Sequence, residues 1–168
     1  MNFENCLELI MRYEGGYSND SLDPGGETKF GISKRAYPKL NIKELTLENA
    51  KTIYRLDYWD RISCDLLHPA IRLIVFDCAV NQGVARASIY LQRSVGVNSD
   101  GMLGPITFAA LKDVDPQLII TKYAGYRHES YIKNPRWNIF GAGWSARLLD
   151  VTIRSLIYSN ALSLARIP

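Results

Sequence analysis

Residues 14–32 constrain the fold of this chain more than any other part of the sequence. Apolar residues recur with the period of a helix from Phe3 to Met11, and two consecutive glycines, Gly15 and Gly16, then end the pattern. Glu14 is therefore predicted to lie in the last turn of a first helix, at the edge of a loop. The run Asp23-Pro24-Gly25-Gly26 is a strong turn signal, so residues 17–32 are predicted to form a loop with a short hairpin.

The remainder of the chain carries helical patterns and no further strand alternation. Thr46 can cap a helix that continues to Tyr58, and an apolar segment after Pro69 is long enough to be a buried central helix. Pro135 to Gly143 is predicted to be a loop, and Leu118 is predicted to face inward. The other predicted helices span residues 85–95, 116–131 and 148–165. We therefore expect one mainly α-helical fold with two lobes.

Charge is distributed unevenly along the chain. The formal net charge is +3, but residues 1–90 contribute −1 and residues 91–168 contribute +4. A basic carboxyl-terminal half is typical of proteins that meet an extended anionic polymer. Peptidoglycan, nucleic acid and an anionic membrane surface all satisfy that description, and no nucleic-acid-binding motif is present.

The cysteines and histidines indicate a protein without disulfides, metal or cofactor. Three cysteines at wide spacing favour buried, reduced thiols, and two histidines offer few ligands for zinc. Glu4 and Glu8 interrupt the first apolar pattern, so no signal peptide is expected, and no segment has the roughly 20 apolar residues that stable membrane insertion needs. We expect synthesis in the cytoplasm. A substrate beyond the inner membrane would then require a holin-like protein or another export factor.

Carboxylates near the first helix suggest acid catalysis of glycoside hydrolysis. Such a reaction needs a proton donor for the leaving oxygen and a group that stabilises positive charge or activates water. Glu14 is the candidate acid, with Asp23 eight residues further on and Thr28 after four more. From spacing alone, Glu14 could instead be a solvated helix-end carboxylate, Asp23 a turn cap, and Thr28 an ordinary strand residue. Asp20 competes with Asp23 for the second role.

Aromatic residues offer stacking surfaces for sugar rings, although most aromatic side chains in proteins of this size belong to the core. The candidates are Tyr17, Tyr123, Tyr126, Tyr131, Trp137 and Trp144.

Glu14-Gly15-Gly16-Tyr17, Asp23-Pro24-Gly25-Gly26 and Thr28-x-x-Gly31-Ile32 together closely resemble glycoside hydrolase family 108. Its members are lysozyme-like muramidases found among phage endolysins and secretion-associated enzymes of bacteria. Asp77-x-x-Val80-Asn81-x-Gly83 resembles a second motif of the family. Leu91 to Thr107, Tyr126-Arg127 and Gly143-Trp144-x-x-Arg147 resemble its predicted peptidoglycan-binding portion.

The resemblance implies a lysozyme-like helical fold in which Glu14 is the essential catalytic glutamate. By analogy with the Glu-Asp-Thr triad of phage-type lysozymes, Asp23 and Thr28 would orient water, although the gap before Thr28 is one residue shorter here. Residues 1–90 would form the catalytic lobe and residues 91–168 a peptidoglycan-binding lobe packed against it. The implied substrate contacts are Tyr17, Asn81, Tyr126, Arg127 and Trp144.

The expected activity is hydrolysis of the glycan strand of peptidoglycan between N-acetylmuramic acid and N-acetylglucosamine, in the periplasm or cell wall. A lytic transglycosylase would use Glu14 as acid and then as base, without an activated water. A non-catalytic wall-binding module is a further alternative, in which Glu14 is only structural. A nucleic-acid binder would depend on the charge of the carboxyl-terminal half alone.

Overall fold

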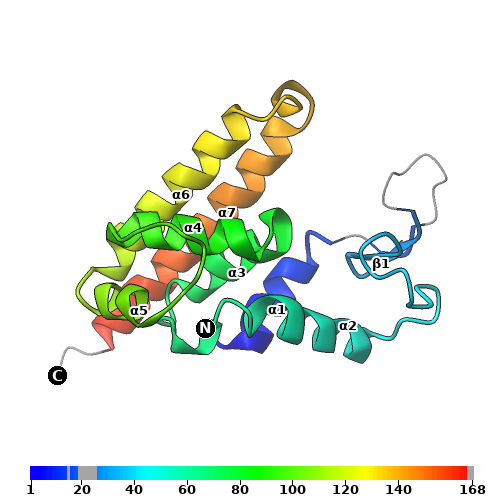
Figure 1. Cartoon of the computed structure of the whole chain (residues 1–168), viewed down its shortest axis with the longest axis horizontal. Coiled ribbons are helices and arrows are strands. Elements are labelled where there is room, and N and C mark those ends of the chain that lie inside the picture. The colour runs from blue at the N-terminus through cyan, green and yellow to red at the C-terminus, as the bar shows by residue number, and fades with distance from the viewer. Residues whose placement is uncertain (15, 19–25, 166–168) are drawn as a thin grey trace.

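The computed structural model describes residues 1–14, 16–18 and 26–165, so Asp20 and Asp23 lie outside the described residues. Seven α-helices and one two-stranded antiparallel sheet form the described part of the chain (Figure 1). The prediction of a mainly α-helical, lysozyme-like fold is therefore confirmed. No helix in this described part is long and apolar enough to cross a membrane.

The first helix, α1 (Phe3–Met11), begins where the side chain of Asn2 accepts a hydrogen bond from the backbone N–H of Asn5, at 2.9 Å. Its buried face consists of Phe3, Cys6, Leu7 and Ile10. The helix ends three residues before Glu14, earlier than predicted, and a turn closed by a bond from the Tyr13 N–H to the Ile10 carbonyl follows. Glu14 thus lies on the segment that leaves the helix.

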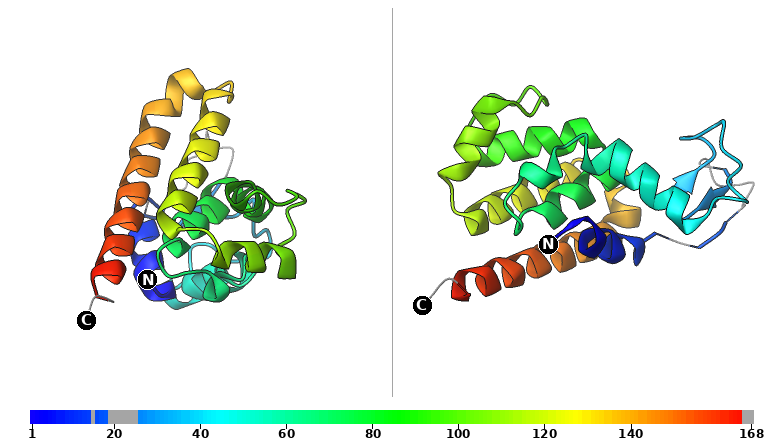
Figure 2. Two further views of the ribbon diagram at one scale, coloured as in Figure 1. Left: turned by 90° about the vertical axis from the view of Figure 1, so that its left-hand side faces the viewer. Right: turned by 90° about the horizontal axis from the view of Figure 1, so that it is seen from below.

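The predicted hairpin is present as β1 (Thr28–Lys29) and β2 (Ile32–Ser33). Phe30 and Gly31 join the strands, and both have positive φ angles, 53° and 74°, as a tight two-residue hairpin turn requires. Ser18 forms an isolated bridge with Thr28 on the other side of β1. The sheet projects from one end of the helical body (Figures 1 and 2).

Thr46 caps α2 (Leu47–Tyr54), as predicted, and a π-helical segment (Arg55–Trp59) continues it. A short 3-10 helix (Cys64–Leu66) leads to α3 (Arg72–Gln82), whose residues from Leu73 to Ala79 are all buried. Helices α1, α4, α6 and α7 all pack against α3. The apolar segment after Pro69 is therefore the central helix of the core.

Gly83 separates α3 from α4 (Val84–Val95), and a turn leads to α5 (Pro105–Lys112). The side chain of Gln92 holds this turn, since its amide nitrogen lies 2.7 Å from an oxygen of Asp100 and its oxygen accepts the Gly101 N–H at 2.8 Å. The motif Asp100-Gly101 is thus part of a structural turn.

The last two helices, α6 (Pro116–Ile132) and α7 (Trp137–Leu164), form a long antiparallel pair (Figure 2). Helix α7 begins eleven residues before the predicted start at Leu148, so the predicted loop at 135–143 is wrong. Gly141 falls within that predicted loop, but it lies against the ring of Trp137, where an added Cβ would approach ring carbons to 2.6 Å. The glycine makes room for an indole and does not end the helix.

One residue of α6 that was predicted to face inward, Leu118, lies outside the buried face of the helix. Ile119, Tyr123, Arg127 and Tyr131 follow one another at four-residue spacing and are buried, whereas Leu118 is 47% exposed. The buried stripe therefore contains a charged residue, and that residue leads into the site described below.

Candidate active site

Glu14 lies against the turn of the hairpin. A Cβ added at Gly31 would come within 2.7 Å of Oε2 of Glu14 and 2.5 Å of the hydroxyl of Tyr54. The absence of a side chain at Gly31, together with its positive φ, therefore lets the turn and the carboxylate approach each other. The buried Tyr54 donates a hydrogen bond of 3.0 Å to the Phe30 carbonyl and so fixes the turn to α2. Burial, and then the charge of Glu14, raises the pKa of Tyr54, which keeps the hydroxyl protonated as a donor.

Arg147 of α7 reaches the same carboxylate from the opposite end of the sequence. Its Nη1 donates to Oε1 of Glu14 at 3.1 Å, and the two side chains are only 13% and 20% exposed. The guanidinium also lies 4.8 Å from the centre of the Tyr13 ring, one residue before Glu14. Glu14 is thus held between the hairpin turn and a cation of the last helix.

Asp77, on the central helix, holds Arg147 in place. Nε of Arg147 donates to Oδ1 of the fully buried Asp77 at 2.8 Å, and Nη2 lies 2.8 Å from the same oxygen. The other oxygen of Asp77 lies 2.9 Å from Nη2 of Arg127, which is also fully buried. Two of these contacts, from Arg147 Nη2 to Asp77 Oδ1 and from Arg127 Nη2 to Asp77 Oδ2, are within ion-pair distance but lack the alignment of a hydrogen bond. Burial opposes the charge of Arg127, but Asp77, with smaller contributions from other neighbouring groups, outweighs that effect, and the pKa of Arg127 is raised.

Arg127 extends this network to the surface. Its Nη2 donates to the Tyr131 hydroxyl at 2.9 Å, and that hydroxyl donates to the side-chain oxygen of Asn81 at 3.2 Å. Asn81 is exposed, one helical turn after Asp77 on α3. When Glu14 is ionised, the two arginines and the two carboxylates, Glu14 and Asp77, leave the cluster formally neutral, so the fold can enclose it without an unbalanced charge.

The structure therefore brings together some of the predicted site residues. Glu14 and Asn81 lie at the two ends of the network. Thr28 is half-buried in the hairpin, where its hydroxyl donates to the Gly26 carbonyl at 3.1 Å. Tyr17 is 48% exposed, and its hydroxyl donates to Glu27 at 2.8 Å.

Three predicted substrate contacts lie on the α6–α7 side, in different environments. Arg127 requires a correction, because a fully buried side chain cannot touch a polymer from this position. Tyr126 lies under the guanidinium of Arg93, 4.6 Å from its ring centre, at the α4–α6 contact. Trp144 is half-buried and packs on Tyr131 and Phe140, with ring centres 5.5 and 5.8 Å apart.

No catalytic role was predicted from the sequence for Arg147, Asp77 or Tyr54. Arg147 was visible as the last residue of Gly143-Trp144-x-x-Arg147, and Asp77 as the first of the second motif. Each is a charged residue in an apolar helical pattern, which is a signal for a buried ion pair. Tyr54 offered no such signal.

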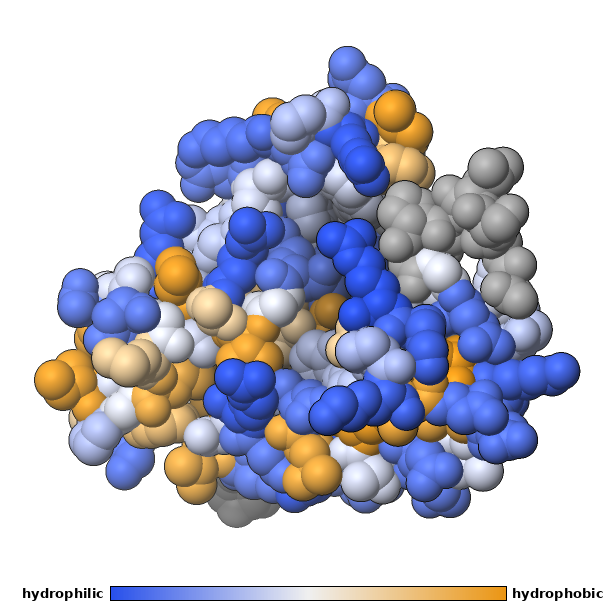
Figure 3. All heavy atoms as spheres, turned by 45° about the vertical axis from the view of Figure 1, so that its right-hand side comes forward, coloured by the Kyte–Doolittle hydropathy of each residue, from blue (hydrophilic) through white to orange (hydrophobic). Residues whose placement is uncertain are grey.

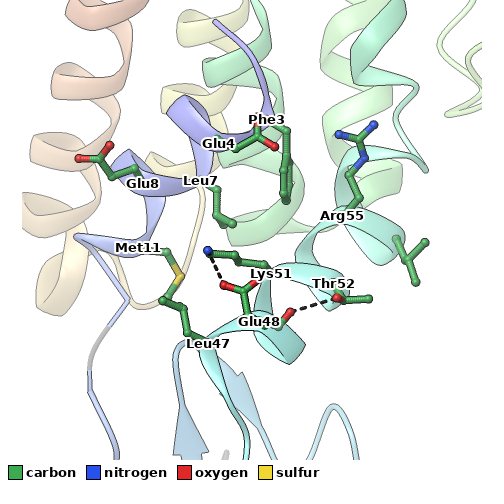
Figure 4. Close-up of a pocket in the computed structure, with 11 residues that line it drawn as sticks. Phe3, Glu4, Leu7, Glu8, Met11, Leu47, Glu48, Lys51, Thr52 and Arg55 are labelled. Carbon is green, nitrogen blue, oxygen red and sulfur yellow. Dashed lines mark hydrogen bonds and ion pairs between the residues drawn. The ribbon is translucent and has the colours of Figure 1, made fainter.

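The structure also has a groove away from Glu14. It measures about 690 Å³ and lies between α1 and α2, with the apolar residues Phe3, Leu7, Met11 and Leu47 in its lining (Figure 4). Lys51 and Glu48 form an ion pair of 2.7 Å at its rim. A second cavity, of about 680 Å³, lies between the 3-10 helix, α5 and the end of α7. Glu14 lines neither of them, so cavity size does not identify the site.

Histidine, cysteine and carboxylate side chains do not form a metal-binding group of three anywhere in residues 1–14, 16–18 or 26–165. The three cysteines are buried and free. Burial raises the pKa of the Cys6 thiol to about 12, which keeps it protonated and unreactive at neutral pH.

Comparison with known proteins adds a family to this geometry. The sequence model of the family described as Glycosyl hydrolase 108 matches residues 7–83. Among solved structures, SagA of Brucella abortus is 33% identical and superimposes with a TM-score of 0.85, covering 94% of this chain and 95% of the SagA chain. No curated protein matches this chain. The family match ends before α4, whereas the likeness to SagA extends over nearly the whole fold.

Proposed function

Since the chain belongs to the glycosyl hydrolase 108 family of peptidoglycan hydrolases, we propose that it is an N-acetylmuramidase that uses Glu14 as its general acid. The bond cleaved is the glycosidic bond from N-acetylmuramic acid to N-acetylglucosamine. The observation that carries the proposal is the position of Glu14, which the Gly31 turn meets on one side and Arg147 on the other.

Glu14 donates its proton to the glycosidic oxygen as the bond to the sugar breaks. Negative charge then develops on the Glu14 carboxylate, and Arg147, 3.1 Å away, stabilises it. Because Asp77 fixes Arg147 from behind, the guanidinium needs no reorganisation during the step. Asp77 and Arg127 are positioning residues in this scheme, since they act through Arg147.

Asp23 and Thr28 act on the opposite side of the reaction, on the sugar cation or on the attacking water. Asp23 stabilises the positive charge on the sugar or orients the attacking water, and Thr28 assists it. The position of Thr28 in the hairpin that bears the Glu14 contact supports this assignment, since it places the hydroxyl on the same small sheet.

Tyr17, Asn81, Tyr126 and Trp144 form the proposed contacts to the glycan. Residues 1–90 are proposed as the catalytic lobe and residues 91–168 as the peptidoglycan-binding lobe. Arg147 belongs to the second range, so the last helix contributes to catalysis as well as to any binding surface. The protein acts at the cell wall, and a holin-like protein or another export factor is its proposed route there.

Analysis of the reaction products tests this proposal. Purified peptidoglycan is digested with the wild type and with Glu14→Gln, and the released fragments are weighed by mass spectrometry after borohydride reduction. Hydrolysis leaves N-acetylmuramic acid ends that borohydride reduces, whereas a lytic transglycosylase leaves anhydro ends, which lack one water and gain no hydrogen on reduction. Reducible N-acetylglucosamine ends would contradict the assigned bond.

Glu14→Gln keeps the size of the side chain and an oxygen for Arg147, but it has no proton to donate. We expect turnover to fall by at least about 10²–10⁴-fold, the usual contribution of acid–base catalysis, with little change in melting temperature. Activity within tenfold of the wild type would refute the role of Glu14. Zymography with the same pair of proteins excludes the non-catalytic alternative if only the wild type clears the gel.

A further inference from the structure

Residues 26–44, which we call the basic lobe, concentrate positive charge beside the active site. The segment contains two acidic residues and five cationic ones, so its net charge of +3 equals that of the entire chain. Its cationic side chains are those of Lys29, Lys34, Arg35, Lys39 and Lys43. The buried side chains of Ile32 and Ile42 anchor the lobe, so its surface has a defined shape.

The cations of the basic lobe have no carboxylate partner within the part of the chain that the structure describes. Lys29 donates to the Lys43 carbonyl at 2.8 Å and Lys34 to the Leu40 carbonyl at 2.6 Å, so both bond to backbone atoms. Arg35, Lys39 and Lys43 are exposed. Their charges therefore remain available to a ligand.

The carboxyl-terminal half, which holds most of the excess charge by sequence, behaves differently. Four of its eight described cations are neutralised by ion pairs: Arg127, Lys133, Arg147 and Arg154. Pairing therefore weakens the expectation from the count of residues. Lys112, Lys122 and Arg136 remain exposed without an ion pair, but the densest run of unpaired cations in the described residues is the basic lobe, although the formal charge of residues 1–90 is −1.

The basic lobe begins at the catalytic carboxylate. Its turn residue Gly31 contacts Glu14, and its Phe30 carbonyl is bonded to Tyr54. From there the lobe extends away from the helical body (Figure 1), and the face turned forward in Figure 3 is largely hydrophilic. A polymer that presents a bond to Glu14 would therefore pass along this lobe.

We propose that the basic lobe binds the free carboxylates of the peptide stems of peptidoglycan, next to the bond presented to Glu14. In intact peptidoglycan the lactyl carboxyl group of muramic acid is bound in an amide, so every free carboxylate belongs to a stem. That peptidoglycan is the ligand rests on the proposed function. Exposed lysine and arginine side chains would hold the stems electrostatically.

An anionic membrane is the other source of negative charge that such a lobe could meet. Membrane-surface segments combine basic residues with large apolar side chains that enter the lipid. No large apolar side chain between residues 26 and 44 is among the exposed ones in the described structure. Carboxylates on a solvated polymer therefore fit the lobe better than a lipid surface.

The test compares two triple variants, each built on the inactive Glu14→Gln background so that the polymer stays intact. The first, Arg35→Gln/Lys39→Gln/Lys43→Gln, removes three charges from the basic lobe and keeps the backbone bonds made by Lys29 and Lys34. The matched control, Lys112→Gln/Lys122→Gln/Arg136→Gln, removes three exposed charges of the carboxyl-terminal half that are not among the proposed glycan contacts. Binding to purified sacculi, to sacculi with amidated carboxylates and to phosphatidylglycerol vesicles is measured by sedimentation.

We expect the lobe variant to bind sacculi about tenfold more weakly, because it lacks three exposed cations that pair with stem carboxylates, and the control to be weakened much less. Amidation of the sacculi should weaken binding of the Glu14→Gln parent to the level of the lobe variant and leave the lobe variant unaffected. Equal weakening in both triple variants, or a difference between parent and lobe variant that persists on amidated sacculi, would refute the proposal. Weaker binding confined to the vesicles would refute it in favour of a membrane.

A charge-preserving variant tests whether the lobe acts through its charge, and a separate readout distinguishes this proposal from the proposed muramidase activity. Arg35→Lys/Lys39→Arg/Lys43→Arg keeps the charge and should bind sacculi like the parent protein; weak binding by this variant would refute the electrostatic role. Binding is measured without turnover, and the bond cleaved is read from product masses. Failure of the muramidase assignment therefore shows in the masses, and failure of the lobe assignment shows in the sedimentation.

Discussion

Arg147 and Glu14 lie 3.1 Å apart although 133 positions separate them in the sequence. The contact joins the last helix to the segment after the first, and Asp77 of the central helix braces it. Residues from three helical regions therefore complete the site. A fragment that stops at the end of the family match, at residue 83, would lack this arginine.

Replacement of Arg147 should reduce turnover more than it reduces stability. We expect Arg147→Met to lower kcat/KM by about 10²-fold, since it removes a charge-assisted bond that strengthens in the transition state. Arg147→Lys should be milder, with a decrease of about tenfold, because an ammonium keeps the charge but cannot bridge two carboxylates with a planar fork. Muropeptide release from peptidoglycan provides the measurement.

The same variants should unfold at lower temperature. In these variants Asp77 loses one buried partner and keeps Arg127, which should lower the free energy of unfolding by about 1–3 kcal/mol. For a domain of this size, each kcal/mol lowers the melting temperature by roughly 2–4 °C. Lys133→Met, which removes an exposed ion pair with Glu129, is the control and should leave both properties nearly unchanged. Full activity in Arg147→Met would show that Glu14 needs no cation.

The local features of this fold followed from the sequence, and the distant contacts did not. The hairpin between residues 28 and 33, the Thr46 cap and the buried central helix were predictable because each depends on neighbouring residues. The start of α7 was not predictable, because Gly141 leaves room for the ring of Trp137 and does not form a turn. Arg127 looked like a surface cation, because its partner, Asp77, lies 50 residues away. A charge count cannot reveal which charges are paired.

Gly31 is expected to be essential for the geometry of Glu14. In Gly31→Ala the new methyl group would meet Glu14 and the Tyr54 hydroxyl at less than contact distance, so the turn must move away from the site. Gly96→Ala is a matched control, because Gly96 has a similar φ of 77° and nothing within 4 Å of the added atom. Both variants should be destabilised by about 1–2 kcal/mol because of the positive φ.

Only Gly31→Ala should also be less active, by tenfold or more, when rates are measured well below both melting temperatures. If the two variants retained equal activity, the close approach of the hairpin to Glu14 would have no role in catalysis.

Asp23 is expected to be the second catalytic carboxylate. Asp23→Asn removes the charge that stabilises the sugar or orients water, so turnover should fall by about 10²-fold or more with little effect on folding. Asp20→Asn in the same segment is the natural comparison and should be mild. The opposite order of effects would assign the second role to Asp20.

Trp144 distinguishes a sugar contact from a packing role. Its ring stacks on Phe140 and contacts Tyr131, whose hydroxyl holds Arg127 and Asn81. Truncation in Trp144→Ala removes this aromatic packing and should therefore lower the melting temperature, by roughly 2–4 °C for each kcal/mol of unfolding free energy. Trp144→Phe keeps an aromatic ring against Tyr131 and should restore most of that stability.

Binding of the two variants to sacculi then separates the roles. The half-buried indole still has an exposed part, so if it is a sugar platform, affinity should fall in both variants, including the stable Trp144→Phe. Measurements at a temperature where all proteins are folded remove the contribution of unfolding. If Trp144→Phe bound sacculi like the wild type, and the weaker binding of Trp144→Ala followed its melting curve, Trp144 would belong to the packing of α6 on α7 and not to the substrate surface.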